Sequence, residues 1–284
     1  MSQCIRMTAI KSFWKKTEPL RMIFEKLRIS ILIFIFSFFG ANTYLDLNPK
    51  WDKPIYIVLH PVNPSNSEKV KTYINGLKQS QFDEISKYMS DYATKYYGKR
   101  VSINYVLANP MENAPLDVTE EQASTILGVL TWTLQFRLYA MLNLKKEDIG
   151  VDGVIYLNYA HDDRATLNRS TALQRGRVAL VNVHANPEDD RQTNMIIAHE
   201  SLHLFGAQDR YDPYYGSPIF PEGYADPKQI PLYPQKRAEI MGGYIPMNER
   251  DFLVPDNLDS VIILQQTAKE VGWLVNANKN KKDN

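Results

Sequence analysis

Cysteine is almost absent from this chain, and histidine is scarce. Cys4 is the only cysteine among 284 residues, and there are five histidines. A single cysteine excludes an intramolecular disulfide, so the fold must rest on its hydrophobic core. With so few histidines, two of them at a metal-ligand spacing are an informative pattern rather than an expected accident.

An excess of charge of either sign is also lacking. The chain has 33 Lys and Arg residues against 32 Asp and Glu residues, a formal net charge of +1. This balance gives no reason to expect a nucleic-acid partner, and we predict none. Internal repeats and low-complexity segments are lacking as well. With 44% hydrophobic residues, the chain can bury one substantial core, so we expect one globular domain with an N-terminal appendage.

The N-terminal appendage begins with basic residues and continues with apolar ones. Residues 1–28 are rich in Lys and Arg, and residues 29–41 contain almost no polar group. Extended to residue 45, the apolar stretch is at the short end of what crosses a bilayer core of about 30 Å. The basic flank predicts a cytoplasmic N-terminus. We therefore expect residues 1–28 to be a basic cytoplasmic segment, residues 29–45 a membrane anchor, and the catalytic domain to lie outside the cytoplasm.

A cleaved signal peptide is the alternative for residues 29–45, and it would make the protein secreted. Its cleavage site should have small residues at the first and third positions upstream. Phe38 and Phe39 precede Gly40 and Ala41 and disrupt the obvious sites, which favours an uncleaved anchor. Met22 is a second candidate start. Each alternative places the metal site in the periplasm or outside the cell.

The rest of the chain alternates strand and helix patterns. A capping box, Thr119-x-x-Gln122, opens a long apolar helix that we expect to pack in the core because Arg137 interrupts its apolar run. The tail 276–284 is predicted to be flexible. The expected strands are residues 54–60, 101–107, 154–159 and 178–183, and the expected helices are residues 67–97 with a break near 79–81 and an end at Gly98, 120–144, the segment from 193 to the histidine motif, and 258–273.

The most informative stretch is the sequence HESLH at residues 199–203. Residues four apart on a helix point the same way, so His199 and His203 can both present a ring nitrogen to one ion. Imidazole binds zinc at roughly 2.0–2.1 Å, and Glu200 can reach a water bound to that ion. An ordinary core helix with satisfied histidines is the alternative, but this motif followed by Gly206 arises by chance in about one such chain in several thousand.

A third ligand is expected just after the helix. Gly206 permits the left-handed turn that ends a helix and redirects the chain, and Asp209 can then return toward the metal. Asp212 is close enough in sequence to compete. Two histidines and one carboxylate leave a fourth position of a tetrahedral zinc open for water, which is the catalytic arrangement. The ion lowers the pKa of that water, and Glu200 accepts its proton.

These residues resemble the signature of the metzincin clan of zinc endopeptidases, His-Glu-x-x-His-x-x-Gly-x-x-His, in the snapalysin-like form with Asp at the last position. The clan also has a methionine turn beneath the metal, and the segment 239–244 is similar to it, with Met241 as the methionine. Tyr244 lies three residues after Met241, whereas some metzincins use a tyrosine two residues after it as a hydrogen-bond donor to the transition state.

The resemblance implies an α/β (α+β) fold of the zincin type over residues 52–275: a twisted, mostly parallel sheet, an active-site helix, and a smaller C-terminal subdomain after the glycine turn. It implies a Zn²⁺ cofactor and a zinc endopeptidase that hydrolyses a protein or peptide substrate, with Glu200 as the general base. Such enzymes bind substrate along a sheet edge, and residues 178–183 are the nearest candidate strand. Two other functions remain open: a non-catalytic, zinc-stabilised binding module and a zinc amidohydrolase acting on a non-protein amide.

Overall fold

The computed structural model describes residues 26–30, 32–33, 44, 46–161 and 167–274. The chain forms two compact units, Met1–Leu45 and Asp46–Asn284. Residues 1–25 and the tail 276–284 lie outside the described residues. The basic N-terminal segment and the flexible tail therefore stay predictions.

The predicted membrane anchor is corrected by the structure. Among the residues that the structure describes, no helix is both long enough and apolar enough to cross a bilayer. This finding contradicts the predicted membrane-anchored location, which rested on the apolar segment 29–45. Most of that segment itself lies outside the described residues.

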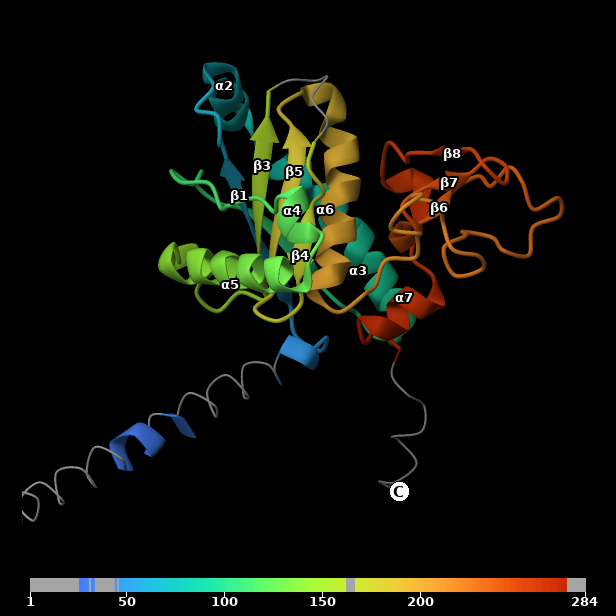
Figure 1. Cartoon of the computed structure of the whole chain (residues 1–284). Helices are drawn as coiled ribbons and strands as arrows, with labels where there is room; N and C mark the ends of the chain where they lie inside the picture. The colour runs from blue at the N-terminus through green and yellow to red at the C-terminus, as the bar shows by residue number, and fades with distance from the viewer. Residues whose placement is uncertain (1–25, 31, 34–43, 45, 162–166, 275–284) are drawn as a thin grey trace, which may run out of the picture. The chain divides into compact units, whose positions relative to one another are not determined.

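A five-stranded sheet forms the centre of the second unit (Figure 1). Its strand order is β2-β1-β3-β5-β4, with β4 antiparallel to β5 and the other neighbours parallel. The prediction of an α/β fold with a mostly parallel sheet is confirmed. The strands are β1 (Ile55–Val62), β2 (Ile103–Leu107), β3 (Gly153–Ala160), β4 (Thr171–Leu173) and β5 (Val178–His184).

Helices cover both faces of this sheet, because successive side chains of a strand point to opposite faces. On one face, alternate residues of β1, β3 and β5 pack with α2 (Glu68–Gly76), α3 (Asp83–Tyr97) and α6 (Asp190–Leu204) in the main core. On the other face, a smaller cluster joins Val154 and Tyr156 of β3 to Trp132 and Phe136 of α5 (Ile126–Leu142).

The helical segment between β1 and β2 was predicted closely. A 3-10 turn, η1 (Gln79–Phe82), separates α2 from α3 where a break was expected. Gly98 ends α3 in the left-handed region, with φ +74°. Such a φ is unstrained for glycine and explains why the helix ends there.

The apolar segment 120–144 differs from its prediction. The capping box at Thr119 exists, but it opens only the short helix α4 (Glu120–Ala123), and a second helix, α5, begins after Thr125. Thr125 accepts a hydrogen bond from the Gly128 amide and caps this second helix.

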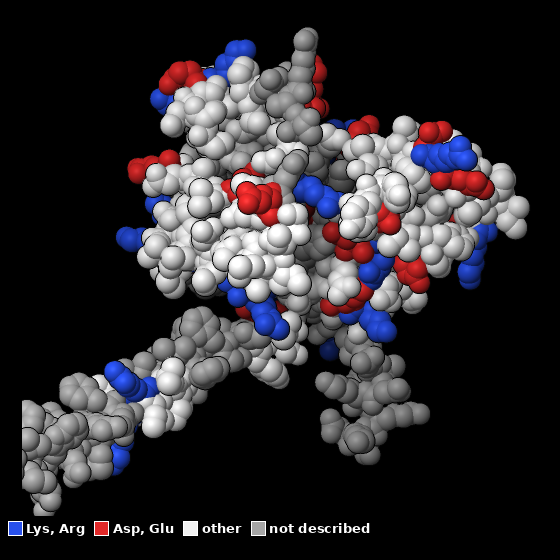
Figure 2. Space-filling model, viewed as in Figure 1, with Lys and Arg blue, Asp and Glu red and all other residues white. Residues whose placement is uncertain are grey.

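The expectation that this segment packs in the core is wrong. Of the residues of α5, Trp132 and Phe136 are buried, whereas Ile126 and Leu134 are 83% and 69% exposed. Only one narrow stripe of the helix faces the sheet, with Tyr139 and Ala140 partly buried beside it, and most of the other apolar side chains are exposed. Figure 2 shows that the surface over α5 carries few charged groups.

The C-terminal part contains short elements. The predicted helix 258–273 is wrong over most of its length, because Val261–Ile262 pairs as strand β9 with β6 (Ala238–Glu239). This pairing overrides the helical spacing of its apolar residues. The other elements of this part are η4 (Ile240–Gly242), β7 (Ile245–Pro246), β8 (Phe252–Leu253), η5 (Leu258–Ser260) and α7 (Gln265–Glu270). Earlier in the chain, η2 (Lys146–Asp148) precedes β3 and η3 (Pro187–Asp189) precedes α6.

Candidate metal centre

Helix α6 presents both motif histidines at one place in the structure. It begins at Asp190, three residues before the predicted start, and Asp190 accepts hydrogen bonds from Tyr73 and Gln81. Most of the helix is buried, but its last turns reach the surface, where the His199 and His203 side chains are partly exposed. The helix is thus fixed by its packing, and its C-terminal end carries the chemistry.

Three ligand atoms converge at this end of α6. The two histidine Nε2 atoms are 3.2 Å apart, and Asp209 Oδ1 lies 3.3 Å from His199 Nε2 and 3.1 Å from His203 Nε2. A tetrahedral ion with ligands at about 2.0–2.1 Å places any two of them about 3.3 Å apart. The three atoms therefore already have the separations that a tetrahedral zinc site requires, and this group can hold a metal ion.

Backbone carbonyls determine which ring nitrogens face the centre. His199 Nδ1 lies 2.9 Å from the Ile240 carbonyl oxygen, and His203 Nδ1 lies 2.8 Å from that of Ala207. A carbonyl only accepts, so each Nδ1 donates its proton and, in the neutral ring, each Nε2 keeps a lone pair. Two lone pairs and a carboxylate oxygen pointing at one centre favour a bound cation.

The turn after α6 brings Asp209 to this centre. Gly206 has φ +103°, and a Cβ there would collide with the Gln174 side chain. The Ala207 amide donates to Leu202, closing the turn. Asp212, the competing carboxylate, instead accepts hydrogen bonds from the amides of residues 214 and 215. The structure thus brings together His199, His203 and Asp209, as predicted.

Electrostatics at the centre favour a positive charge. Burial alone lowers the pKa of His199, but the hydrogen bond to Asp209 and the nearby carboxylates outweigh burial and raise it to about 9. Burial alone raises the pKa of Asp209, yet hydrogen bonds from both histidines hold it far below its usual range. Without a metal, a proton is held among these groups, and a divalent ion can replace that proton.

Glu200 lies next to this centre, where its carboxylate is within electrostatic reach of both histidines and of Asp209. Its side chain is 5% exposed, and its Oε2 atom is buried without a hydrogen bond from any described residue. Burial raises the pKa of Glu200, and the two imidazoles offset part of that rise. An unpaired carboxylate oxygen beside a metal-binding group suits a general base.

The segment around Met241 supports the site through its backbone. Met241 is fully buried in η4, and the carbonyl of the preceding residue, Ile240, accepts the hydrogen bond from His199. The Met241 carbonyl in turn accepts from the Arg210 amide, directly after Asp209. This turn therefore orients one ligand and fastens the chain beside another, whereas Met241 itself packs in the core.

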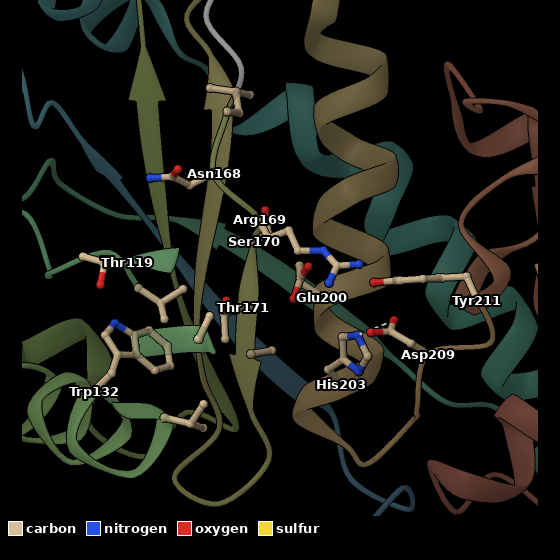
Figure 3. Close-up of a pocket in the computed structure, with 15 residues that line it drawn as sticks. Thr119, Trp132, Asn168, Arg169, Ser170, Thr171, Glu200, His203, Asp209 and Tyr211 are labelled. Carbon is tan, nitrogen blue, oxygen red and sulfur yellow. Dashed lines mark hydrogen bonds and ion pairs between the residues drawn. The ribbon is translucent and has the colours of Figure 1, made fainter. Parts of the chain in front are cut away.

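Tyr244 is not brought to the metal centre. Its ring lies beside Gly216, and it does not line the cleft that contains Glu200. Tyr211 lines that cleft and extends toward Glu200 and Asp209 (Figure 3). Burial raises the pKa of Tyr211 and Asp209 raises it further, so its hydroxyl stays protonated and can donate a hydrogen bond.

A cleft of about 580 Å³ leads from the metal centre across β4 toward α4 and α5 (Figure 3). Its far end is lined by apolar side chains, among them Trp132. Thr171 and Ala172 of β4 line its floor. β4 is the edge strand, and it separates β5 from this edge. The candidate substrate strand, residues 178–183, is therefore a central strand. The edge strand has only three residues and is too short to detect by periodicity.

Several residues of the site were not predicted. Arg169 lines the cleft and lies over the ring of Tyr211, with its guanidinium carbon 5.3 Å from the ring centroid. Glu239 is buried and accepts hydrogen bonds from the amides of Met241 and Gly242, which holds the methionine turn in place. The position of Glu239, directly before Ile240 and Met241, was the available signal in the sequence. Nothing in the sequence pattern singles out Arg169. Tyr211 belongs to the tyrosine-rich segment after Asp209, which the sequence predicts as part of the cleft wall, and it does line the cleft.

Comparisons with known proteins add little to this geometry. No protein-family model and no curated protein matches the chain. A similar solved structure, titled "Structure of a chaperone-substrate complex", has a TM-score of 0.35 and 14% sequence identity, and the match covers 74% of this chain and 31% of that chain. The chain thus spans under a third of that chain's length. So distant a likeness carries no argument, and membership of the metzincin clan stays a prediction.

Proposed function

We propose that this protein is a zinc-dependent endopeptidase of the metzincin type. The observation that carries the proposal is the triangle of His199 Nε2, His203 Nε2 and Asp209 Oδ1, with sides of 3.1–3.3 Å. Beside it lies Glu200, whose buried Oε2 atom has no hydrogen-bond partner among the described residues. Three ligands with an open fourth position are the arrangement of catalytic rather than structural zinc sites.

Each residue has a defined task in this proposal. His199, His203 and Asp209 hold the zinc ion, which when bound polarises the scissile carbonyl and acidifies a water molecule. Glu200 accepts a proton from the attacking water and later delivers it to the leaving amine. Tyr211 is protonated and faces the cleft, so it is placed to donate a hydrogen bond to the substrate carbonyl.

The edge strand supports a peptide as the substrate. Among the described residues β4 pairs only with β5, so its other side can add an extended peptide as a further strand. Thr171 and Ala172 of β4 line the same cleft as Glu200. The order strand, helix, strand, insertion, strands and active-site helix also agrees with the order that the resemblance to metzincins implies.

Metal analysis and one substitution test the proposal. The purified chain should contain close to one zinc ion per molecule and cleave denatured proteins, and a chelator should abolish cleavage. Glu200→Gln should keep the zinc but lose at least about 10²–10⁴-fold in rate, because the ligands remain and the base is removed. His203→Ala should lose both zinc and activity.

The same measurements separate the alternatives. A zinc-stabilised binding module would keep its zinc and cleave nothing, and an amidohydrolase would cleave a non-protein amide but no protein. A folded chain that neither contains nor takes up zinc contradicts the proposal. So does unchanged proteolysis by Glu200→Gln.

A further inference from the structure

The cleft beside the metal centre contains a cation that the proposed chemistry does not use. Arg169 lies two residues before strand β4, and its side chain extends toward Glu200 and Tyr211 (Figure 3). Its guanidinium stacks over the Tyr211 ring. Among the described residues, no carboxylate lies within ion-pair distance of it, but its charge acts on Glu200 and offsets part of the rise in the Glu200 pKa.

The backbone beneath Arg169 is held firmly. Asn182, a buried residue of β5, donates from its side chain to the Arg169 carbonyl at 3.2 Å, and its amide donates to the Ser170 hydroxyl at 3.0 Å. Asp117 accepts hydrogen bonds from the side chains of both Asn168 and Asn182. This network positions the Arg169 backbone at the rim of the cleft while the guanidinium remains available to a ligand.

The charges in the cleft are unbalanced once a metal is bound. Besides the histidine, the charged residues that line it are Arg169, Glu200 and Asp209. The two carboxylates together offset the charge of a divalent ion, so with that ion bound the guanidinium gives this end of the cleft a net charge of +1. A guanidinium presents its donors as a rigid planar fork that matches a carboxylate in bidentate geometry.

We propose that Arg169 is a specificity-determining residue that selects substrates carrying a carboxylate close to the scissile bond. This inference rests on the proposed peptidase function. The carboxylate belongs either to an Asp or Glu side chain of the substrate or to its C-terminus. Arg169 binds that group while the zinc site takes the neighbouring peptide bond.

Peptide binding to an inactive protein tests this without relying on catalysis. The probes are three series of N-acetylated hexapeptides. In the first series, a single Asp occupies each position in turn and the C-terminus is amidated. The second series has Asn in place of that Asp and the same amidated C-terminus, and the third has the Asn sequences with a free C-terminal carboxylate. Dissociation constants are measured with Glu200→Gln and with Glu200→Gln/Arg169→Gln, each with and without zinc. Arg191→Gln on the same background is the control, because Arg191 pairs with Asp259 on the surface.

We expect at least one acidic series to bind better than its neutral partner, and Arg169→Gln to remove that preference by weakening acidic peptides about 10- to 100-fold. Neutral peptides should bind equally to both proteins. Arg169→Lys should keep part of the preference, since it retains charge but not the fork. Whether the Asp series or the free-acid series responds identifies the source of the carboxylate.

Three results would overturn the inference: no acidic preference in the parent protein, a preference that survives Arg169→Gln, or an equal loss for acidic and neutral peptides. An equal loss would assign Arg169 to general substrate positioning instead. Zinc content and melting temperature of each variant show whether it is folded. Acid-selective binding without any hydrolysis by the wild type would refute only the peptidase function, and hydrolysis without charge selectivity would refute only the role of Arg169.

Discussion

At the scale of single residues, one carboxylate decides whether the two histidines become a metal site. Asp209 completes the triangle, whereas Asp212 is occupied by two backbone amides of its own turn. Both residues were candidates in the sequence, because they are only three positions apart and a wider turn after Gly206 would bring Asp212 to the histidines instead.

Asp209→Ala should therefore weaken zinc binding severely, and Asp212→Ala should leave zinc bound. Asp209→His should restore binding with a less negative ligand set, which lowers the pKa of the bound water and shifts the pH–rate profile to lower pH. Zinc titration of the three variants checks this. Zinc retained by Asp209→Ala but lost by Asp212→Ala would reverse the assignment.

A second residue pair matters for stability rather than for catalysis. His60 is fully buried, with Nε2 2.7 Å from Asp148 Oδ1 and Nδ1 3.1 Å from the Asn109 carbonyl oxygen. Both partners only accept, so this environment favours the imidazolium, which donates from both ring nitrogens. Burial alone lowers the pKa of His60, but these hydrogen bonds outweigh burial and raise it. Burial alone raises the pKa of Asp148, and its hydrogen bond with His60 lowers it overall.

This pair should make the unfolding free energy decrease both at acidic pH and at alkaline pH. Because the folded pKa of His60 is raised, its stabilisation is complete below the unfolded value of about 6.5 and is lost as pH rises through the folded value. Asp148 has a lowered folded pKa, so its contribution is lost as pH falls through that value. Urea unfolding from about pH 2 to pH 9 should show both losses, the Asp148 loss at pH values below its ordinary pKa of about 3.9. Asp148→Asn should remove both losses and cost about 3–5 kcal/mol near pH 6.

At the scale of elements, the end of α6 links helix geometry to metal geometry. Gly206 redirects the chain with a φ that other residues adopt only under strain, and Asp209 follows within three residues. The same turn supplies the Ala207 carbonyl that orients His203. One turn thus positions a ligand and fixes the orientation of another.

Gly206→Ala should lower the unfolding free energy by about 1–3 kcal/mol and also weaken zinc binding, because the strained turn displaces Asp209. Gly76→Ala is the matched control: its added Cβ meets no atom within 4 Å and Gly76 is not among the glycines with positive φ. Calorimetric unfolding and zinc titration of both variants check the prediction. Unchanged zinc affinity in Gly206→Ala would show that the turn does not position the ligand.

At the scale of the whole molecule, the metal centre fastens the sheet-and-helix part of the second unit to its C-terminal part. His199 donates to Ile240, Arg210 donates from its amide to Met241, and the Arg210 side chain pairs with Glu270 of α7. A bound ion would add a further link between α6 and the segment that follows it.

Zinc should therefore stabilise the whole unit. Free zinc at about 1,000 times its dissociation constant adds about 4 kcal/mol, which for a unit of this size raises the melting temperature by about 8–16 °C. Scanning calorimetry with zinc and with chelator measures the difference. His203→Ala provides the control, since its melting temperature should not respond to zinc. An equal response in both proteins would place the stabilising ion elsewhere.

The sequence alone determined the parts of this protein that depend on local spacing. The four-residue interval between His199 and His203, the glycine that ends the helix and the alternation of strands with helices all follow from local rules, and the structure has them. The order of strands in the sheet, the short edge strand β4 and the outward apolar face of α5 depend on pairing and on which side of an element meets the sheet.

Only the tertiary structure decided what surrounds the motif. The hydrogen bonds of the turn occupy Asp212 and leave Asp209 as the third candidate ligand. Tyr211 rather than Tyr244 lines the cleft, because the chain folds back after residue 209. Arg169 reaches the same cleft from a different segment. These residues have no common spacing with the motif, since contacts between distant segments arise from packing, which a local pattern does not encode.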